Sequence, residues 1–511
     1  MKKFIQFITL ASVICSCTSN MPSKFDETSA KAKIYPEYDS IVIPCNIAPM
    51  NFKIEEGADE YAVCAACGEQ KLTASAGKEG KIEFESGKWK KLVSESVGKD
   101  ITLNIFAKKD GKWIKFADNL MRVCADSIDK YLTYRLIEPS YMSSAQLGLY
   151  QFDLETGCED EIVSTHYDYK QPHNRNFKCV NCHTSQRNKP ENKMFYYRCP
   201  NGGLLISYNG KFMKVNTKAG DMFAGTVYPS WHPFLPYIAF SSNNVKQGFH
   251  SFDKSKIETF DQYSDLVLYN IEKNEITPIR KTYDKQETNP CWSGDGQYLY
   301  FNSSDSLFTK HYEPNMMKYD IFRIKFNADS LTWGENEMVF NATKDNKSAT
   351  YPKVSPDNKY LLFTRADWGT STQTNKSADL WLIDLEKNTS RNIVEVNCPT
   401  EADSYHDWSS NSKWIVFCSR REDGNYARAY FSHIDQNGRF SKPFIIPCSD
   451  PDHNRELLRN YNVTEFTTAP STWSKKDIRD VLNGELINAN YGGEIDPHMA
   501  DAYSGATTVI K

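Results

Sequence analysis

The chain has 511 residues, of which 40% are hydrophobic and 25% are charged, and its formal net charge is −4. This balance gives no electrostatic support for a nucleic-acid partner, and the length allows two or three domains. Aromatic residues are abundant, with 29 Tyr, 28 Phe and 10 Trp, and this composition favours β-structure.

Residues 1–16 have the pattern of a bacterial lipoprotein signal peptide. Lys2 and Lys3 precede an apolar run over 4–14, which is too short to cross a bilayer as a helix. Ile14-Cys15-Ser16-Cys17 resembles a lipobox, in which cleavage leaves Cys17 as the lipidated first residue. The alternative is an ordinary cleaved signal with an incidental cysteine. We expect an exported protein that acyl chains hold on the periplasmic face or on the outer membrane surface.

A β-sandwich is predicted next along the chain. Residues 17–31 are polar and small and predict a tether. Within 32–136, the stretch 100–107 alternates between apolar and polar residues, and Asp110-Gly111 marks a hairpin turn. About seven short strands in roughly 100 residues predict an immunoglobulin- or fibronectin-like sandwich. It contains a second C-x-x-C pair, Cys64 and Cys67, for which a place in a strand is favoured over a redox pair.

The most specific motif is Cys179-Val180-Asn181-Cys182-His183, the C-x-x-C-H spacing of a covalent c-type haem. Cys179 and Cys182 would form the thioethers, and His183 would be the proximal iron ligand. A redox or zinc pair is the alternative, although no second pair of zinc ligands lies nearby. The polar segment 163–193 predicts a haem-binding loop inserted near the start of the following domain.

The second axial ligand of such a haem stays open. Met194 lies eleven residues beyond His183, and His173 lies upstream in the same segment. His232 is a third candidate, but it stands where the repeats described next carry serine, so a turn residue that caps backbone groups is favoured. A methionine ligand would raise the reduction potential relative to two histidines.

A repeat fixes the fold predicted for residues 137–472. Each copy leads into a hydrophobic strand, and the copies begin at Tyr228–Pro233, Asn289–Gly294, Tyr351–Pro356 and Tyr405–Ser410. Repeats of short strands at a period of roughly 55 to 60 residues predict a β-propeller. Two weaker units near 148–153 and 203–215 bring the expected count to six blades. The stretch 463–468 is a candidate to complete the first blade by strand addition.

The repeats are similar to the TolB-type (PD40) propeller repeat, through Ser355-Pro356-Asp357-Asn358 and Ser293-Gly294-Asp295-Gly296. The whole arrangement resembles Bacteroidetes-type exported lipoproteins that combine a TolB-like propeller with a single c-type haem motif. The residues that carry this resemblance are Glu138–Tyr141, the haem motif with Thr184, and Tyr228–Pro233. It implies an electron-transfer or scaffold role in the cell envelope.

Two functions from different classes follow. The leading prediction is a membrane-anchored monohaem cytochrome with covalent haem c, whose propeller docks a redox or envelope protein. The alternative is a propeller interaction or scaffold protein that binds a protein, peptide or glycan. The chain has no Gly-x-Ser-x-Gly elbow, so a hydrolase is not favoured, and peroxidase-like chemistry is the most concrete enzymatic option. The tail, 473–511, predicts one helix over 474–486 with Ser474 as N-cap.

Overall fold

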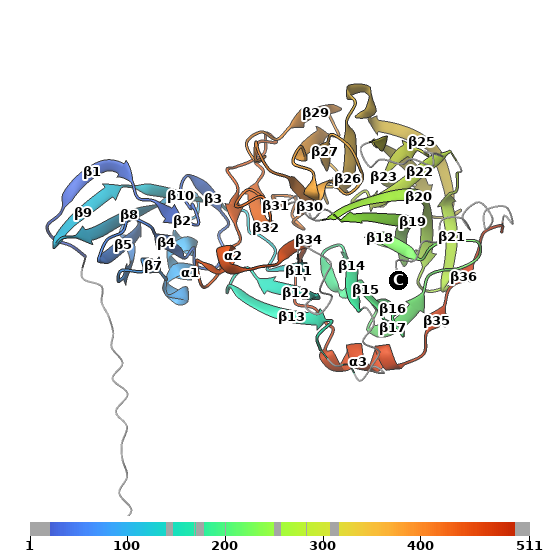
Figure 1. The fold of residues 1–511 in the computed structure, drawn as a ribbon, viewed down its shortest axis with the longest axis horizontal. Coiled ribbons are helices and arrows are strands. Elements are labelled where there is room, and N and C mark those ends of the chain that lie inside the picture. Colours follow the sequence, from blue (N-terminus) through green and yellow to red (C-terminus); the bar gives the residue numbers. More distant parts are fainter. Residues whose placement is uncertain are drawn as a thin grey trace, which may run out of the picture.

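Two β-rich parts lie side by side, a smaller N-terminal domain and a ring of sheets (Figure 1). The computed structural model describes residues 21–138, 147–167, 169, 178–199, 201–249, 257–282, 284–306 and 316–495. The predicted signal peptide, Cys17 and His173 lie outside the described residues. No helix among the described residues is both long and apolar enough to cross a membrane.

The N-terminal domain consists of two sheets and one helix, α1 (Ser86–Glu95), which the sequence analysis missed. The larger sheet contains β1 (Asp26–Lys31), β3 (Ile41–Ile43), β5 (Glu60–Cys67), β6 (Gln70–Ala76), β8 (Asp100–Lys109), β9 (Lys112–Ala117) and β10 (Asn119–Val123). The smaller sheet contains β2 (Ile34–Tyr35), β4 (Phe52–Ile54) and β7 (Lys81–Ile82). Cys64 and Cys67 lie in β5, as favoured from the sequence.

The predicted tether over 17–31 is wrong at its end, because β1 pairs with β9 in the larger sheet. Five of its six residues are exposed, so this edge strand carries no apolar alternation that a sequence analysis would detect.

Six sheets form the ring, which confirms the predicted number of blades. Their strands follow the chain and are, in order, β11 (Tyr131–Ile137), β12 (Gly148–Asp153) and β13 (Cys158–Ser164); β14 (Cys179–Gln186), β15 (Lys189–Arg198), β16 (Gly203–Tyr208) and β17 (Lys211–Asn216); β18 (Thr226–Trp231), β19 (Tyr237–Phe249), β20 (Ile257–Asn270) and β21 (Glu275–Arg280); β22 (Lys285–Trp292), β23 (Tyr298–Asp305), β24 (Asp320–Asn327) and β25 (Thr332–Phe340); β26 (Ser348–Val354), β27 (Tyr360–Ala366), β28 (Asp379–Asp384) and β29 (Thr389–Asn392); β30 (Asp403–Trp408), β31 (Trp414–Ser419), β32 (Arg428–His433) and β33 (Phe444–Ile445).

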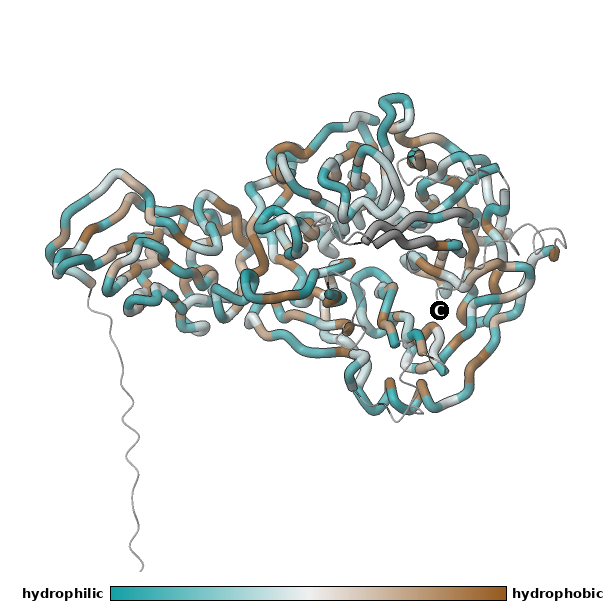
Figure 2. Tube along the Cα trace, in the orientation of Figure 1, coloured by the Kyte–Doolittle hydropathy of each residue, from teal (hydrophilic) through white to brown (hydrophobic). Residues whose placement is uncertain are grey.

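The burial of a strand depends on its place in the blade, between the centre of the ring and the rim. All six residues of β31, the second strand of blade 6, are buried because neighbouring blades cover both faces of the sheet. The outermost strand β25 is mostly exposed. Hydrophobic and hydrophilic stretches therefore alternate along the chain throughout the ring (Figure 2).

The ring is closed by a strand from the far end of the domain. β34 (Asn460–Thr467) pairs antiparallel with β11 and becomes the innermost strand of blade 1, as predicted for 463–468. The propeller therefore begins at Tyr131 and not at residue 137, because β11 pairs only with propeller strands. The sequence analysis had placed residues up to 136 in the sandwich.

The tail wraps the outside of blades 2 and 3 (Figure 1). The predicted helix is α3 (Lys475–Asn483), and Ser474 caps it in a capping box with Asp477. The strands β35 (Ile487–Asn488) and β36 (Asn490–Tyr491) then add in parallel to β17 and β21. A short helix, α2 (His453–Glu456), precedes β34.

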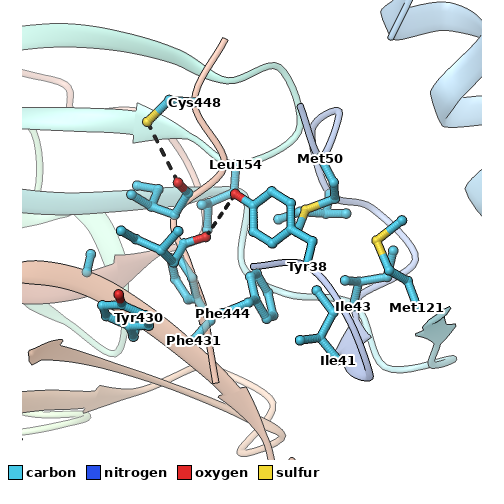
Figure 3. Packing of buried hydrophobic residues seen from close by; sticks show 14 of the residues in the cluster. Tyr38, Ile41, Ile43, Met50, Met121, Leu154, Tyr430, Phe431, Phe444 and Cys448 are labelled. Atoms are coloured by element: carbon cyan, nitrogen blue, oxygen red, sulfur yellow. Dashed lines mark hydrogen bonds between the residues drawn. The ribbon is translucent and has the colours of Figure 1, made fainter. Parts of the chain in front are cut away.

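The two domains share one apolar core. Tyr38, Ile41 and Ile43 from the N-terminal domain lie against Tyr430, Phe431 and Phe444 of blade 6, and all six are buried (Figure 3). The Tyr38 hydroxyl donates to the carbonyl of Ile445 at 3.4 Å. Residues from both parts thus exclude water together.

Candidate functional site

The innermost strand of every blade carries a bulge at an equivalent position, and these six bulges form a ring. At each bulge the strand register shifts and one residue takes a left-handed backbone, with φ between 36° and 53°. These six residues are Cys182, Tyr228, Asn289, Tyr351, Tyr405 and Val463. The residues that follow them are His183, Pro229, Pro290, Pro352, His406 and Thr464.

All twelve residues line one cavity of about 790 Å³, the central channel of the propeller. Known ligand pockets in proteins span roughly 300 to 1,000 Å³, so the channel is large enough for a small molecule or a short peptide segment. Tyrosine supplies three of the six ring positions. The ring of Tyr351 lies 5.1 Å from that of Tyr405, and its hydroxyl donates to Gln373 at 3.2 Å.

The charged residues of the channel wall are mostly cationic. Four of them are basic and two are acidic, and they are Arg135, Arg198, Lys353, Arg420, Glu138 and Glu465. The carboxylate of Glu465 lies 3.5 Å from the ammonium group of Lys193. An anion in the channel would therefore meet a positive field.

Arg420 is the most unusual of these cations. It is only 9% exposed, and its Nε has no hydrogen-bond partner. Among the described residues, the carboxylates of Asp423 and Glu401 act on its guanidinium through their charges. Burial nevertheless lowers the pKa of this guanidinium. Burying a cation costs several kcal/mol and the two carboxylates offset only part of that cost, so an anionic ligand would stabilise the residue further.

Arg135 on β11 is another buried cation of the channel wall, and amide and carbonyl oxygens accept hydrogen bonds from it. Its Nη atoms donate to Asn181, to the carbonyl of Val180 and to Asn462, and its Nε is unpartnered. Two residues of the C-x-x-C-H motif therefore hold Arg135 in place at the channel wall.

The motif itself lies on the strand β14 and not in an inserted loop, which corrects the prediction for 163–193. The polar residues around the motif, which had predicted a loop, have a different explanation. β14 is the innermost strand of blade 2 and faces the channel. Cys182 and His183 occupy the same positions as Tyr405 and His406 in blade 6.

The imidazole of His183 is closed off from the channel, with a side chain 1% exposed. Its Nε2 lies 2.8 Å from the carbonyl oxygen of Val463, and its Nδ1 lies 3.3 Å from Glu465 Oε2. Burial lowers the pKa of His183, although Glu465 opposes the shift. His406 makes the equivalent contact, with its Nε2 3.2 Å from the carbonyl of Leu362. Both imidazoles thus bind a blade to the one before it.

The thiols of Cys179 and Cys182 pack on different neighbours. Cys179 is buried against Ile137 and Leu147 of blade 1, whereas Cys182 packs against the apolar cluster between blades 2 and 3. A c-type haem needs both thiols at one porphyrin edge and a free imidazole nitrogen. In this arrangement the three residues do not fit a covalent haem.

The candidate distal ligands also lie apart from the channel lining. Met194 on β15 is fully buried in the cluster between blades 2 and 3. His232 Nδ1 accepts from the backbone N–H groups of Phe234 and Leu235 at 3.1 and 3.0 Å. This is the capping role that the sequence favoured. In the next repeat, the serine at this position, Ser293, also accepts a hydrogen bond from the backbone. Its Oγ accepts from the N–H of Tyr298.

Sequence reasoning missed the arginines of the channel and the ring of bulges. A signal for the ring was present, because Tyr-Pro or Asn-Pro opens three repeats and Tyr-His opens a fourth. Aligning Cys182-His183 with Tyr405-His406 would have placed the motif on an innermost strand. Arg135 and Arg420 have no sequence signal, because their isolation depends on neighbours from other blades.

The comparisons identify no family for this chain. No protein-family description and no curated protein matches the sequence. The solved structures similar to it include TolB from Acinetobacter baumannii, with 10% identity over 74% of this chain and 84% of that one and a TM-score of 0.40. The β-propeller domain of Cps50 (Swd1) from Myceliophteria thermophila has 11% identity over 72% of this chain and 95% of that one, with a TM-score of 0.33. A puromycin-hydrolysing peptidase from Mycobacterium tuberculosis has 9% identity and a TM-score of 0.35, and 83% of this chain matches 57% of that one.

Proposed function

We propose that this protein is an exported, lipid-anchored binding protein that takes an anionic ligand into the central channel of its propeller. The observation that carries the proposal is the buried guanidinium of Arg420, whose Nε has no hydrogen-bond partner, on the wall of a cavity of about 790 Å³. Arg135, Arg198 and Lys353 add positive charge to the same wall. The tyrosines of the bulge ring offer flat faces and hydroxyl groups beside these cations.

A carboxylate is the ligand group that suits this wall. Guanidinium groups bind carboxylates through paired, charge-assisted hydrogen bonds, and such bonds gain strength away from water. The proposed ligand is therefore a peptide segment with acidic side chains or a free C-terminus, consistent with a scaffold role in the envelope.

The direct test uses a fluorescein-labelled hexaglutamate peptide, with hexalysine and hexaserine as matched probes, in fluorescence anisotropy. We expect the glutamate peptide alone to bind, and its affinity to fall as salt rises. Arg420→Gln should weaken binding at least tenfold, since one charge-assisted contact is worth on the order of 1.5 to 3 kcal/mol.

The control is Arg122→Gln, which removes an exposed arginine that pairs with Asp100 on the N-terminal domain. It should leave the affinity for hexaglutamate unchanged. Equal binding of all three peptides, or equal loss in the two variants, would refute the proposed site.

The membrane anchor has its own test. Cys17→Ser should move the protein from the membrane fraction to the soluble exported fraction without changing hexaglutamate binding. A protein that stays in the membrane fraction would disprove lipidation at Cys17.

A second candidate is the monohaem c-type cytochrome. The observation in its favour is that Cys179, Cys182 and His183 all line the channel. Against it stands the imidazole of His183, both of whose nitrogens lie within hydrogen-bond distance of other groups. Protein produced in a cytochrome-assembling host and denatured should show no haem stain if the channel binder is correct. A covalent haem that Cys179→Ser abolishes would establish the cytochrome instead.

A further inference from the structure

A separate group of metal-ligating side chains lies where the N-terminal domain meets blade 6, far along the chain from the channel motif. Cys124 follows β10, Asp126 comes two residues later, and His433 ends β32. One donor atom from each residue lies within 4.8 Å of the other two. All three side chains are partly exposed, so an ion from solvent has access.

The cluster is held in place by its surroundings. His433 Nε2 lies 2.8 Å from Asp126 Oδ2, and the ring of His433 lies 4.9 Å from that of Trp414. The indole N–H of Trp414 donates to the backbone carbonyl of Asp126 at 3.2 Å. Such outer contacts orient ligands in known metal sites and hold them ready for an ion.

A second thiol lies beside the cluster. Cys45 follows β3, which pairs in parallel with β10, and the Cys124 N–H donates to the carbonyl of Ile43 at 3.0 Å. Burial raises the pKa of both thiols, and the charge of Asp126 raises each of them further. Asp126 thus lies close enough to both thiols to act on them through its charge.

We propose that Cys124, Asp126 and His433 bind one Zn²⁺ ion, which joins the N-terminal domain to the propeller. A thiolate, an imidazole and a carboxylate are the ligands that zinc prefers, and three protein ligands leave its fourth tetrahedral position to water or to Cys45. Binding replaces the Cys124 proton by the metal, so one proton leaves for each thiolate formed. Because the ligands come from both domains, the ion stabilises their contact.

The test titrates Zn²⁺ into the full-length protein, after chelation and reduction, in competition with a chromophoric zinc chelator. We expect one zinc per chain. Cys124→Ser and His433→Gln should each weaken binding tenfold or more. With Co²⁺ in place of zinc, a thiolate-to-metal charge-transfer band should appear and should be lost in Cys124→Ser. Zinc should raise the melting temperature of the parent protein and not that of Cys124→Ser.

The control is Cys158→Ser, which removes an exposed thiol on β13 of blade 1. Its zinc affinity should equal that of the parent. Circular dichroism confirms that each variant is folded before titration. A lack of zinc binding, or equal binding by Cys124→Ser and the parent, would overturn the proposal. A Cys45–Cys124 disulfide found by mass spectrometry in protein from the envelope would also overturn it.

Discussion

Val463 shows how far the bulge ring constrains single residues. It is a β-branched residue at φ 50°, whereas the equivalent position in blade 4 carries Asn289. A left-handed backbone costs an ordinary residue roughly 1 to 2 kcal/mol, and Asn tolerates it best after Gly. The strand that closes the ring therefore carries a strained residue at its bulge.

Replacing this residue by Asn should release the strain. We expect Val463→Asn to raise the free energy of unfolding by about 1 kcal/mol, as measured by urea titration. Val463→Thr is the matched control, because threonine keeps the branch at Cβ and the strain with it. A Val463→Asn variant no more stable than Val463→Thr would contradict this reading of the bulge.

Buried histidines make the molecule sensitive to acid. Burial lowers the pKa of His232 to about 4 and that of His406 to about 3. Between about pH 4 and 6.5 the unfolded chain binds protons that the folded chain does not, so stability falls as the pH falls. For His232 the loss across this window is on the order of 3 kcal/mol.

His232→Ser isolates this contribution, because serine fills the same position in the other repeats. The variant should unfold more easily at pH 7, since the imidazole packs on Trp292. Its stability should nevertheless depend less on pH between 4 and 6.5 than that of the parent, in denaturant titrations at each pH. An unchanged slope would show that folding does not lower the pKa of His232.

At the scale of elements, β34 is the strand on which ring closure depends. Glu465 on β34 accepts from the backbone N–H of Ser185 at 2.6 Å and from Thr184 Oγ1 at 3.1 Å, both on β14. The Lys193 side chain, which is fully buried, lies 3.5 Å from the same carboxylate. Burial would raise the pKa of Glu465, but Lys193 and His183 hold it at about 2.

Removing one partner of this pair should therefore cost more than removing both. Glu465→Gln leaves Lys193 buried without a counter-charge and should lower the free energy of unfolding by about 3 kcal/mol or more. The double variant Lys193→Met with Glu465→Gln should recover most of that loss, as a double-mutant cycle in urea would measure. If the two losses simply add, the pair is not coupled.

The same element shows what the sequence could predict. The closing strand, the blade number and the Ser474 cap follow from local patterns of apolar and turn residues, and the structure agrees with them. The wrong boundary at 137 arises because β11 is the second strand of blade 1 and pairs with β34, which lies far along the chain. The wrong loop at 163–193 has another cause, because β14 is an innermost strand. Innermost strands face a polar channel on one side and partners from distant parts of the chain on the other. Their sequence therefore combines strand and loop signals.

At the scale of the whole molecule, the two domains behave as one packed body. Ion pairs surround the shared core, including Lys53 with Asp452 at 3.0 Å and Lys442 with Glu37 at 2.8 Å. Asp129 accepts from the backbone N–H of Ser410 at 2.6 Å. Domains joined by small polar contacts move independently, whereas a continuous apolar core couples them. The N-terminal domain and the propeller should therefore move together.

A coupled body should unfold in one step. Calorimetry of the full chain should show a single transition, and hydrogen exchange should report equal opening free energies for β8 in the N-terminal domain and β31 in the propeller. Tyr38→Ala removes a ring that is 1% exposed at the joint. It should cost roughly 3 to 5 kcal/mol and lower the protection of both strands together. Loss of protection in β8 alone, or two separate calorimetric transitions, would show that the domains fold independently and that the shared core does not couple them.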